Sequence, residues 1–173
     1  MSETEIVNRV QNSGLVVLEL DQLLPEVEIV ELDIADFLFQ GLILKEKEFR
    51  TALKELDLDR YKDKVVAVSC SADAIIPMWA YMLVASVLNP VASALYFGDT
   101  RKAREQFILS KVRDLDLANW EAKRVVVKGC SGEDVPESVY LELSTRLTPV
   151  VQSLMFGEPC STVPVFKKPR NKV

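Results

Sequence analysis

Short runs rich in β-branched residues alternate with longer helical runs over residues 64–156. Lys64-Val-Val-Ala-Val-Ser69 and Arg124-Val-Val-Val-Lys128 each follow a polar segment and predict strands. Residues 74–88 are apolar on nearly every side and predict a buried helix. The predicted order is strand 64–69, helix 74–88, strand 92–97, helix 100–113, strand 124–128, helix 136–147 and strand 151–156. Strands that alternate with helices predict an α/β fold with an open, mainly parallel sheet.

Two prolines decide where two of these helices end. Residues 137–155 have the spacing of one long helix, but Pro149 lies inside it. A proline in a helix interior costs about 3 kcal/mol, so we expect the helix to end before it. Pro90 has the same place after the first buried run. Strands are therefore predicted after both prolines.

The chain contains a duplication with an offset of 59 residues. Residues 57–99 and 116–158 share 13 identities in 43 positions at this offset, among them Pro77 with Pro136 and Tyr81 with Tyr140. Chance would give about three, because a globular composition is spread over many residue types. The chain therefore holds two copies of one βαβ unit.

The ends of the chain carry weaker patterns. Residues 1–56 predict a β-meander followed by a helix, with strands at 15–20, 28–34 and 38–44 and the helix at 45–56. Residues 160–173 predict an edge strand containing Pro164, followed by a basic tail. No linker or change in composition separates these parts, so residues 1–173 are expected to form a single domain.

Composition and charge narrow the class of protein. The net charge of −5 and the pI of about 4.9 disfavour nucleic acid or an anionic membrane as a partner. The uncharged stretch 74–98 is interrupted by Asn89-Pro90, so a buried helix and strand fit it better than a membrane span. The odd number of cysteines and the lack of a secretory signal predict reduced thiols and a cytoplasmic protein. No glycine-rich nucleotide motif is present.

The three cysteines are the candidate functional residues. Cys70 and Cys130 each follow a predicted strand, and Cys160 comes just after the last repeat strand. Because ligands gather at the carboxyl ends of parallel strands, we expect the three thiols at one edge of the sheet. There is no histidine, and three thiolates with one carboxylate or water would complete a site for zinc or an iron–sulfur cluster. The candidate carboxylates are Asp73, Asp99 and Glu158.

Two other interpretations stay open. Cys70 could act as a nucleophile or sulfur carrier that Cys160 resolves, so whether the chain is an enzyme is undecided. Alternatively the cysteines are inert, since a single cysteine is most often a small buried apolar residue, and the duplicated sheet carries a partner surface or forms a homo-oligomer. Asp73 is more often a helix cap than a ligand.

Several runs resemble a known family over nearly the whole chain. They are Asn8-Arg9-Val10, Leu38-Phe-Gln-Gly-Leu-Ile-Leu-Lys-Glu-Lys47, Val68-Ser-Cys-Ser-Ala-Asp-Ala-Ile-Ile-Pro-Met-Trp-Ala-Tyr-Met82, Lys128-Gly-Cys130 and Phe156-Gly-Glu-Pro-Cys-Ser-Thr-Val-Pro164. They are similar to the bacterial family known as domain of unknown function 2480. That family has no assigned activity, so the resemblance implies no catalytic residues. It implies an association with iron–sulfur cluster assembly, and hence assembly proteins as partners.

Overall fold

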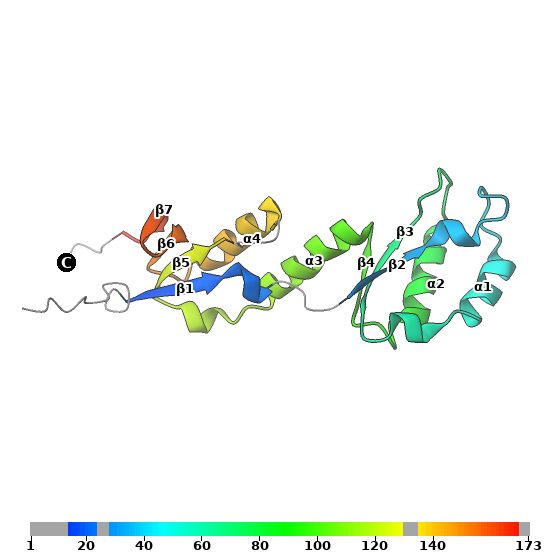
Figure 1. Ribbon diagram of the computed structural model, residues 1–173, viewed down its shortest axis with the longest axis horizontal. Helices are drawn as coiled ribbons and strands as arrows, with labels where there is room; N and C mark the ends of the chain where they lie inside the picture. The colour runs from blue at the N-terminus through cyan, green and yellow to red at the C-terminus, as the bar shows by residue number, and fades with distance from the viewer. Residues whose placement is uncertain (1–13, 24–27, 130–134, 170–173) are drawn as a thin grey trace, which may run out of the picture. The chain divides into compact units, whose positions relative to one another are not determined.

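The computed structural model describes residues 14–23, 28–129 and 135–169, which form two compact units. Unit 2 holds residues 25–107, and unit 1 holds the described residues on either side of that range. Each unit has a sheet of its own (Figure 1). The mixed α/β, mainly parallel fold predicted from the sequence is confirmed, with its strands divided between two sheets.

Unit 2 is a three-stranded parallel sheet with helices packed against it. Its strands are β2 (Ile29–Asp33), β3 (Val65–Ser69) and β4 (Ala94–Phe97), in the order β2-β3-β4. Its helices are α1 (Glu46–Lys54), α2 (Met78–Leu88) and residues 100–107 of α3, with short 3-10 helices at Ile34–Phe37 and Leu58–Tyr61. Val66 and Val68 of β3 share one buried cluster with Val84 of α2 and Phe49 of α1. These two valines are two residues apart, so they lie on the same face of the sheet, the face that packs against α1 and α2.

Unit 1 is a four-stranded sheet with one antiparallel edge. Its strands are β1 (Leu15–Glu19), β5 (Arg124–Lys128), β6 (Ser153–Glu158) and β7 (Ser161–Lys167), in the order β1-β5-β6-β7. Its helices are α4 (Glu137–Leu147), the last part of α3 (Thr100–Arg113) and short 3-10 helices at Leu20–Leu23 and Leu117–Trp120. Only β7 runs antiparallel to its neighbour among these described strands. It is the edge strand predicted around Pro164.

The predicted duplication is confirmed down to single hydrogen bonds. Val65 pairs with Ala94 in unit 2, and Arg124 pairs with Ser153 in unit 1, which is the same register 59 residues later. Asp63 and Ala122 both have positive φ, 58° and 54°, at the turn before the central strand. Their backbone N–H groups donate to the carbonyl oxygens of Val91 and Val150, each at 2.9 Å. The strands predicted after Pro90 and Pro149 are also present, as β4 and β6.

The structure extends the duplication beyond the part visible in the sequence. Helix α1, residues 46–54, corresponds at the same offset to residues 105–113 of α3. Phe49 and Leu53 are buried in the core of unit 2, and their counterparts Ile108 and Val112 are buried in the core of unit 1. The side chains changed while their burial was kept, so identity alone did not reveal this part of the repeat.

Strands β1 and β2 correct the predicted N-terminal meander. Both strands form, but β1 pairs in parallel with β5 and β2 in parallel with β3. Leu15 lies opposite Arg124 as Ile29 lies opposite Val65, so each supplies the same edge to one copy of the repeat. The third predicted strand, 38–44, is a turn with one isolated bridge between Phe39 and Ile43. Alternation predicts a strand but does not identify its partner.

Helix α2 is shorter than predicted and begins at Met78 instead of residue 74. Pro77 occupies the N-cap position without a side-chain cap, so residues 70–77 form a loop. The uncharged stretch 74–98 therefore holds part of a loop, a helix of 11 residues and a short strand. In the described part of the chain, no helix is long and apolar enough to cross a membrane.

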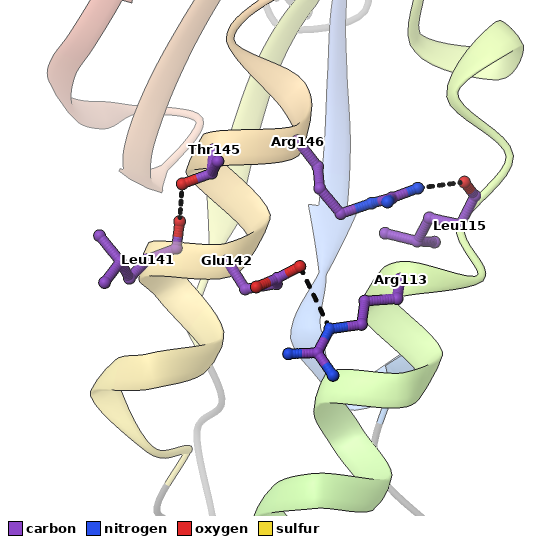
Figure 2. Close-up of polar contacts among 6 residues, drawn as sticks. All are labelled: Arg113, Leu115, Leu141, Glu142, Thr145 and Arg146. Atoms are coloured by element: carbon purple, nitrogen blue, oxygen red, sulfur yellow. Dashed lines mark hydrogen bonds and ion pairs between the residues drawn. The ribbon is translucent and has the colours of Figure 1, made fainter.

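Polar contacts join α4 to the end of α3 in unit 1 (Figure 2). Arg113 pairs with Glu142 at 3.4 Å, and the Arg146 side chain donates to the Leu115 carbonyl oxygen at 3.3 Å. The positions equivalent to Glu142 and Arg146 in unit 2 are apolar, Leu83 and Val87, and both pack against the core there. The two copies thus use different chemistry to hold equivalent helices together.

Candidate functional site

Cys70 lies at the carboxyl end of β3, the central strand of unit 2. Its thiol is half-buried and donates a weak hydrogen bond to the Ala72 carbonyl oxygen at 3.6 Å. Tyr81 of α2 lies near it: burial raises the pKa of the Tyr81 phenol, and the charge of a Cys70 thiolate raises it further. The thiol therefore lies in a partly apolar corner between the strand end and α2.

Asp33 holds the loop that carries Cys70. Its carboxylate accepts hydrogen bonds from the backbone N–H groups of Ala35 at 2.9 Å and Ser71 at 3.0 Å. Burial alone would raise the pKa of this carboxyl, but these bonds and one from the Ser71 hydroxyl lower it overall. Asp33 ends β2, which neighbours β3, so the ends of two strands fix the start of this loop. Sequence reasoning did not single out Asp33, because β2 was assigned to a meander.

The other two cysteines lie elsewhere in the chain. Cys160 is exposed in the tight turn between β6 and β7 of unit 1. Cys130 lies outside the described residues. Cys70 and Cys160 belong to different units, so the meeting of all three thiols at one edge stays a prediction.

The three candidate carboxylates have separate local roles. Asp99 precedes α3 and accepts a hydrogen bond from the Lys102 backbone N–H at 2.8 Å, as a helix N-cap does. Glu158 pairs with Lys128 across β6 and β5 at 3.6 Å. Asp73 is exposed in the loop before α2, five residues before the first helical residue, so it is not the cap that we expected. Among the described residues, no group of three or more cysteine and carboxylate side chains could hold a metal ion.

A pair of equivalent apolar grooves is the feature that both units share. The α2 groove of unit 2 has a volume of about 180 Å³. It is lined by Val68, Tyr81, Ala85, Leu95, Tyr96 and Phe97. The α4 groove of unit 1 has a volume of about 410 Å³. It is lined by Val127, Tyr140, Leu143, Ser144, Leu154, Met155, Phe156, Val163 and Val165. Every residue of the α2 groove has its 59-residue counterpart in the α4 groove.

Each groove has the same aromatic pair as its floor. The Tyr81 and Phe97 rings meet edge to face with centroids 5.5 Å apart, and Tyr140 and Phe156 do so at 5.7 Å. Both residues of each pair are identical in the two copies, which was the available sequence signal. Both tyrosines line their groove in addition to packing against the phenylalanine.

The edge strand distinguishes the two grooves. In unit 1, β7 pairs with β6 and adds Val163 and Val165 to the α4 groove. In unit 2, β4 is the last strand of its sheet, and the chain turns directly into α3. Phe97 is accordingly 61% exposed, against 42% for Phe156. One groove thus has its edge strand, and the equivalent groove does not have one among the described residues.

Comparison with known proteins gives one family. No curated protein and no solved structure matches the chain. Residues 4–168 match the family described as "Protein of unknown function (DUF2480)", which covers nearly the whole chain. The resemblance seen in the sequence is therefore confirmed, and the chain belongs to this family.

Proposed function

We propose that this chain is a binding protein, and that its α2 groove receives an extended segment of a partner protein as an added strand beside β4. The observation that carries the proposal is the equivalent edge in unit 1, where β7 pairs antiparallel with β6. The chain thus contains an example of the occupant that this edge accepts. Binding by strand addition is a common mode of peptide recognition.

The outer edge of β4 has the features that such binding needs. Gly98 donates its N–H to Val68 of β3, so by alternation Leu95 and Phe97 direct their backbone groups away from β3. Residues 89–98 contain no charged side chain, although charges commonly protect edge strands. One outward carbonyl, that of Phe97, already accepts from the Gln106 side chain at 3.1 Å. Pairing is therefore centred on Leu95.

Strand β7 indicates the sequence that such a partner would have. Val163 and Val165 are two residues apart and both line the α4 groove. We expect the partner segment to carry apolar side chains at alternating positions, which would lie over Tyr81 and Phe97. In a symmetric dimer through this edge, a second copy would offer its own four-residue β4, with the Phe97 carbonyl already engaged. A longer partner segment therefore fits better than self-association.

The test uses a labelled peptide with the sequence of β7, Ser161–Lys167, added to the intact protein. We expect saturable binding that Phe97→Lys weakens at least tenfold, because a charge at this exposed position opposes an apolar occupant. The matched control is Leu42→Lys, since Leu42 is 64% exposed in the same unit and lies outside the groove. Absence of peptide binding overturns the proposal. So does a dimer, seen by sedimentation, that Phe97→Lys dissociates, because the occupant would then be a second copy.

A thiol-ligated metal site is the second candidate function. Its ligands would be Cys70, Cys130 and Cys160, and the half-exposed Cys70 at a central strand end supports it. Zinc or an iron–sulfur cluster is the metal group that thiolates favour. Since Asp99 caps a helix and Glu158 has an ion pair, either would give up its present contact to become the fourth ligand. Cys70 as a reactive thiol resolved by Cys160 is the alternative at the same residues.

We also propose the cellular compartment and the class of partner for both candidate functions. We place the protein in the cytoplasm, on the odd cysteine count and the expectation of reduced thiols. Iron–sulfur assembly proteins are the partner class that the family resemblance implied. Such a partner would supply the extended segment for β4 and, for the metal candidate, the cluster or metal.

A further inference from the structure

A second cavity in unit 1 has a different character from the grooves. Its volume is about 460 Å³, within the usual range of sites for small molecules. It is lined by Arg124, Gln152, Ser153, Met155, Pro164, Phe166, Lys167 and Lys168. Three of these residues are cations and none is an acid, although the whole chain has a net charge of −5. The cavity is therefore a local basic site in an acidic protein.

The strand register explains how these residues come together. Arg124 of β5 lies opposite Ser153 of β6, which lies opposite Lys167 of β7. Side chains at paired positions lie side by side on one face of a sheet. The neighbouring residues Val125 and Leu154 pack in the core with α4, so this row lies on the opposite face. Three adjacent strands thus direct a guanidinium, a hydroxyl and an ammonium to one face.

Ser153 is the least exposed polar residue that lines this cavity. It is only 9% exposed and is the one buried polar or charged residue in the described part of the chain. Its backbone N–H donates to the Lys123 carbonyl oxygen at 3.4 Å. Its hydroxyl can donate a hydrogen bond to an anion in the cavity.

Unit 2 serves as an internal control for this site. The positions equivalent to Arg124 and Ser153 are Val65 and Ala94, which pair in the same register. Gln152 and Met155 correspond to Ser93 and Tyr96. The same fold therefore forms with an apolar pair in this place. The register of these paired strands therefore does not depend on an arginine and a serine at these positions.

We propose that this cavity is a binding site for a small organic anion. The phosphate or carboxylate group would lie among Arg124, Lys167 and Lys168 and accept a hydrogen bond from the Ser153 hydroxyl. Arginine suits this task because its planar group donates two parallel hydrogen bonds to either anion. Met155, Pro164 and Phe166 line the remaining wall and favour an apolar body on the ligand. The site is separate from the α2 groove and does not depend on the proposed partner segment.

Calorimetric titration of the full-length protein tests the proposal with three probes: inorganic phosphate, phenyl phosphate and benzoate. We expect saturable binding that is strongest for an aromatic probe, because it fills both the basic and the apolar wall. Tighter binding of phenyl phosphate identifies a phosphate ester as the ligand class, and tighter binding of benzoate identifies a carboxylate. Affinity should fall as salt concentration rises, since the attraction is partly electrostatic.

The two test variants replace a cavity residue with the residue at the equivalent position of unit 2. Arg124→Val should weaken binding about tenfold or more, as expected for loss of a charge-assisted bidentate contact. Ser153→Ala should weaken it several-fold while leaving the thermal unfolding temperature about unchanged, because alanine is the residue at the equivalent position of unit 2. Lys62→Val, which removes an exposed cation from unit 2, is the matched control and should bind as the original protein does. Absence of saturable binding for all three probes overturns the proposal, as does unchanged affinity in a folded Ser153→Ala, Arg124→Val double variant.

Discussion

Gly98 and Gly157 show how one residue position is constrained differently in the two copies. Both have φ of +123°, a conformation that glycine adopts easily and other residues rarely. A Cβ at Gly157 would lie 2.6 Å from the backbone oxygen of Ser161, whereas one at Gly98 would meet the side chain of Lys102. The two glycines were visible in the sequence because each is followed by an acidic residue at the same position of its repeat. The close approach of β7 was not, because it depends on the partner of β6.

Replacement of each cysteine by serine separates the remaining interpretations of the thiols. If a metal is bound, Cys70→Ser, Cys130→Ser and Cys160→Ser should each lower metal content and Tm by similar amounts, because each opens the same site. Cys160 is the most informative, since it is exposed in a hairpin turn and its replacement should otherwise leave Tm unchanged.

Elemental analysis, thermal unfolding and alkylation rates measure these outcomes. If Cys70→Ser alone abolishes alkylation by a thiol reagent with little change in Tm, the reactive-thiol interpretation holds. A third outcome is that the protein contains no metal and that only Cys70→Ser lowers the Tm. This outcome would contradict the metal-site and reactive-thiol interpretations and would leave the cysteines as packing residues.

At the scale of single elements, the two repeat helices bury the same three positions. In α2 these positions are fully buried, and in α4 they are at most 1% exposed. They are Ala80, Val84 and Leu88 in α2 and Val139, Leu143 and Leu147 in α4. The period of apolar residues could predict these helices, and the prolines could predict their ends. The start of α2 could not be predicted, because residues 74–77 are as apolar as the helix and only the Pro77 backbone separates them.

Leu88→Ala and Leu147→Ala should each lower the free energy of unfolding by about 2–5 kcal/mol, as buried leucine truncations do. Hydrogen exchange should show the loss of protection within unit 2 for the first and within unit 1 for the second, since each helix belongs to a separate core. Leu42→Ala is the control, because Leu42 is 64% exposed. Equal loss of protection in both units for either variant would show that their cores unfold together.

At the scale of the whole molecule, the order of helices and strands along the chain was largely predictable, but the division of the strands between two sheets was not. Length and even composition predicted a single domain, and that stays a prediction. The register of β1 with β5 was not accessible, because an alternating run contains no information about a partner so distant in sequence. The three cysteines were placed at one sheet edge on the assumption of a single sheet. With the strands in two sheets, that assumption no longer brings Cys70 and Cys160 together.

A fragment of residues 25–107 should fold alone, because it is one continuous segment with its own sheet and core. Circular dichroism should show α/β structure and a cooperative thermal transition. A fragment of residues 108–173 lacks β1 and Leu18, which is 4% exposed in the core, and should be unfolded or much less stable. Addition of a peptide spanning residues 14–23 should restore part of its structure. An unfolded 25–107 fragment would contradict the independence of unit 2.

The insertion of unit 2 between β1 and the rest of unit 1 has a consequence for synthesis on the ribosome. Val65, which pairs with Ile29, is synthesised about 36 residues after it. Arg124, which pairs with Leu15, is synthesised about 110 residues after it. At roughly 5–20 residues per second, β1 is without its neighbour for about 5–20 s after it emerges. Unit 2 is complete during that time. Among the described strands, β1 is thus separated from its sheet neighbour for the longest time, and its apolar residues are available to a chaperone during that time.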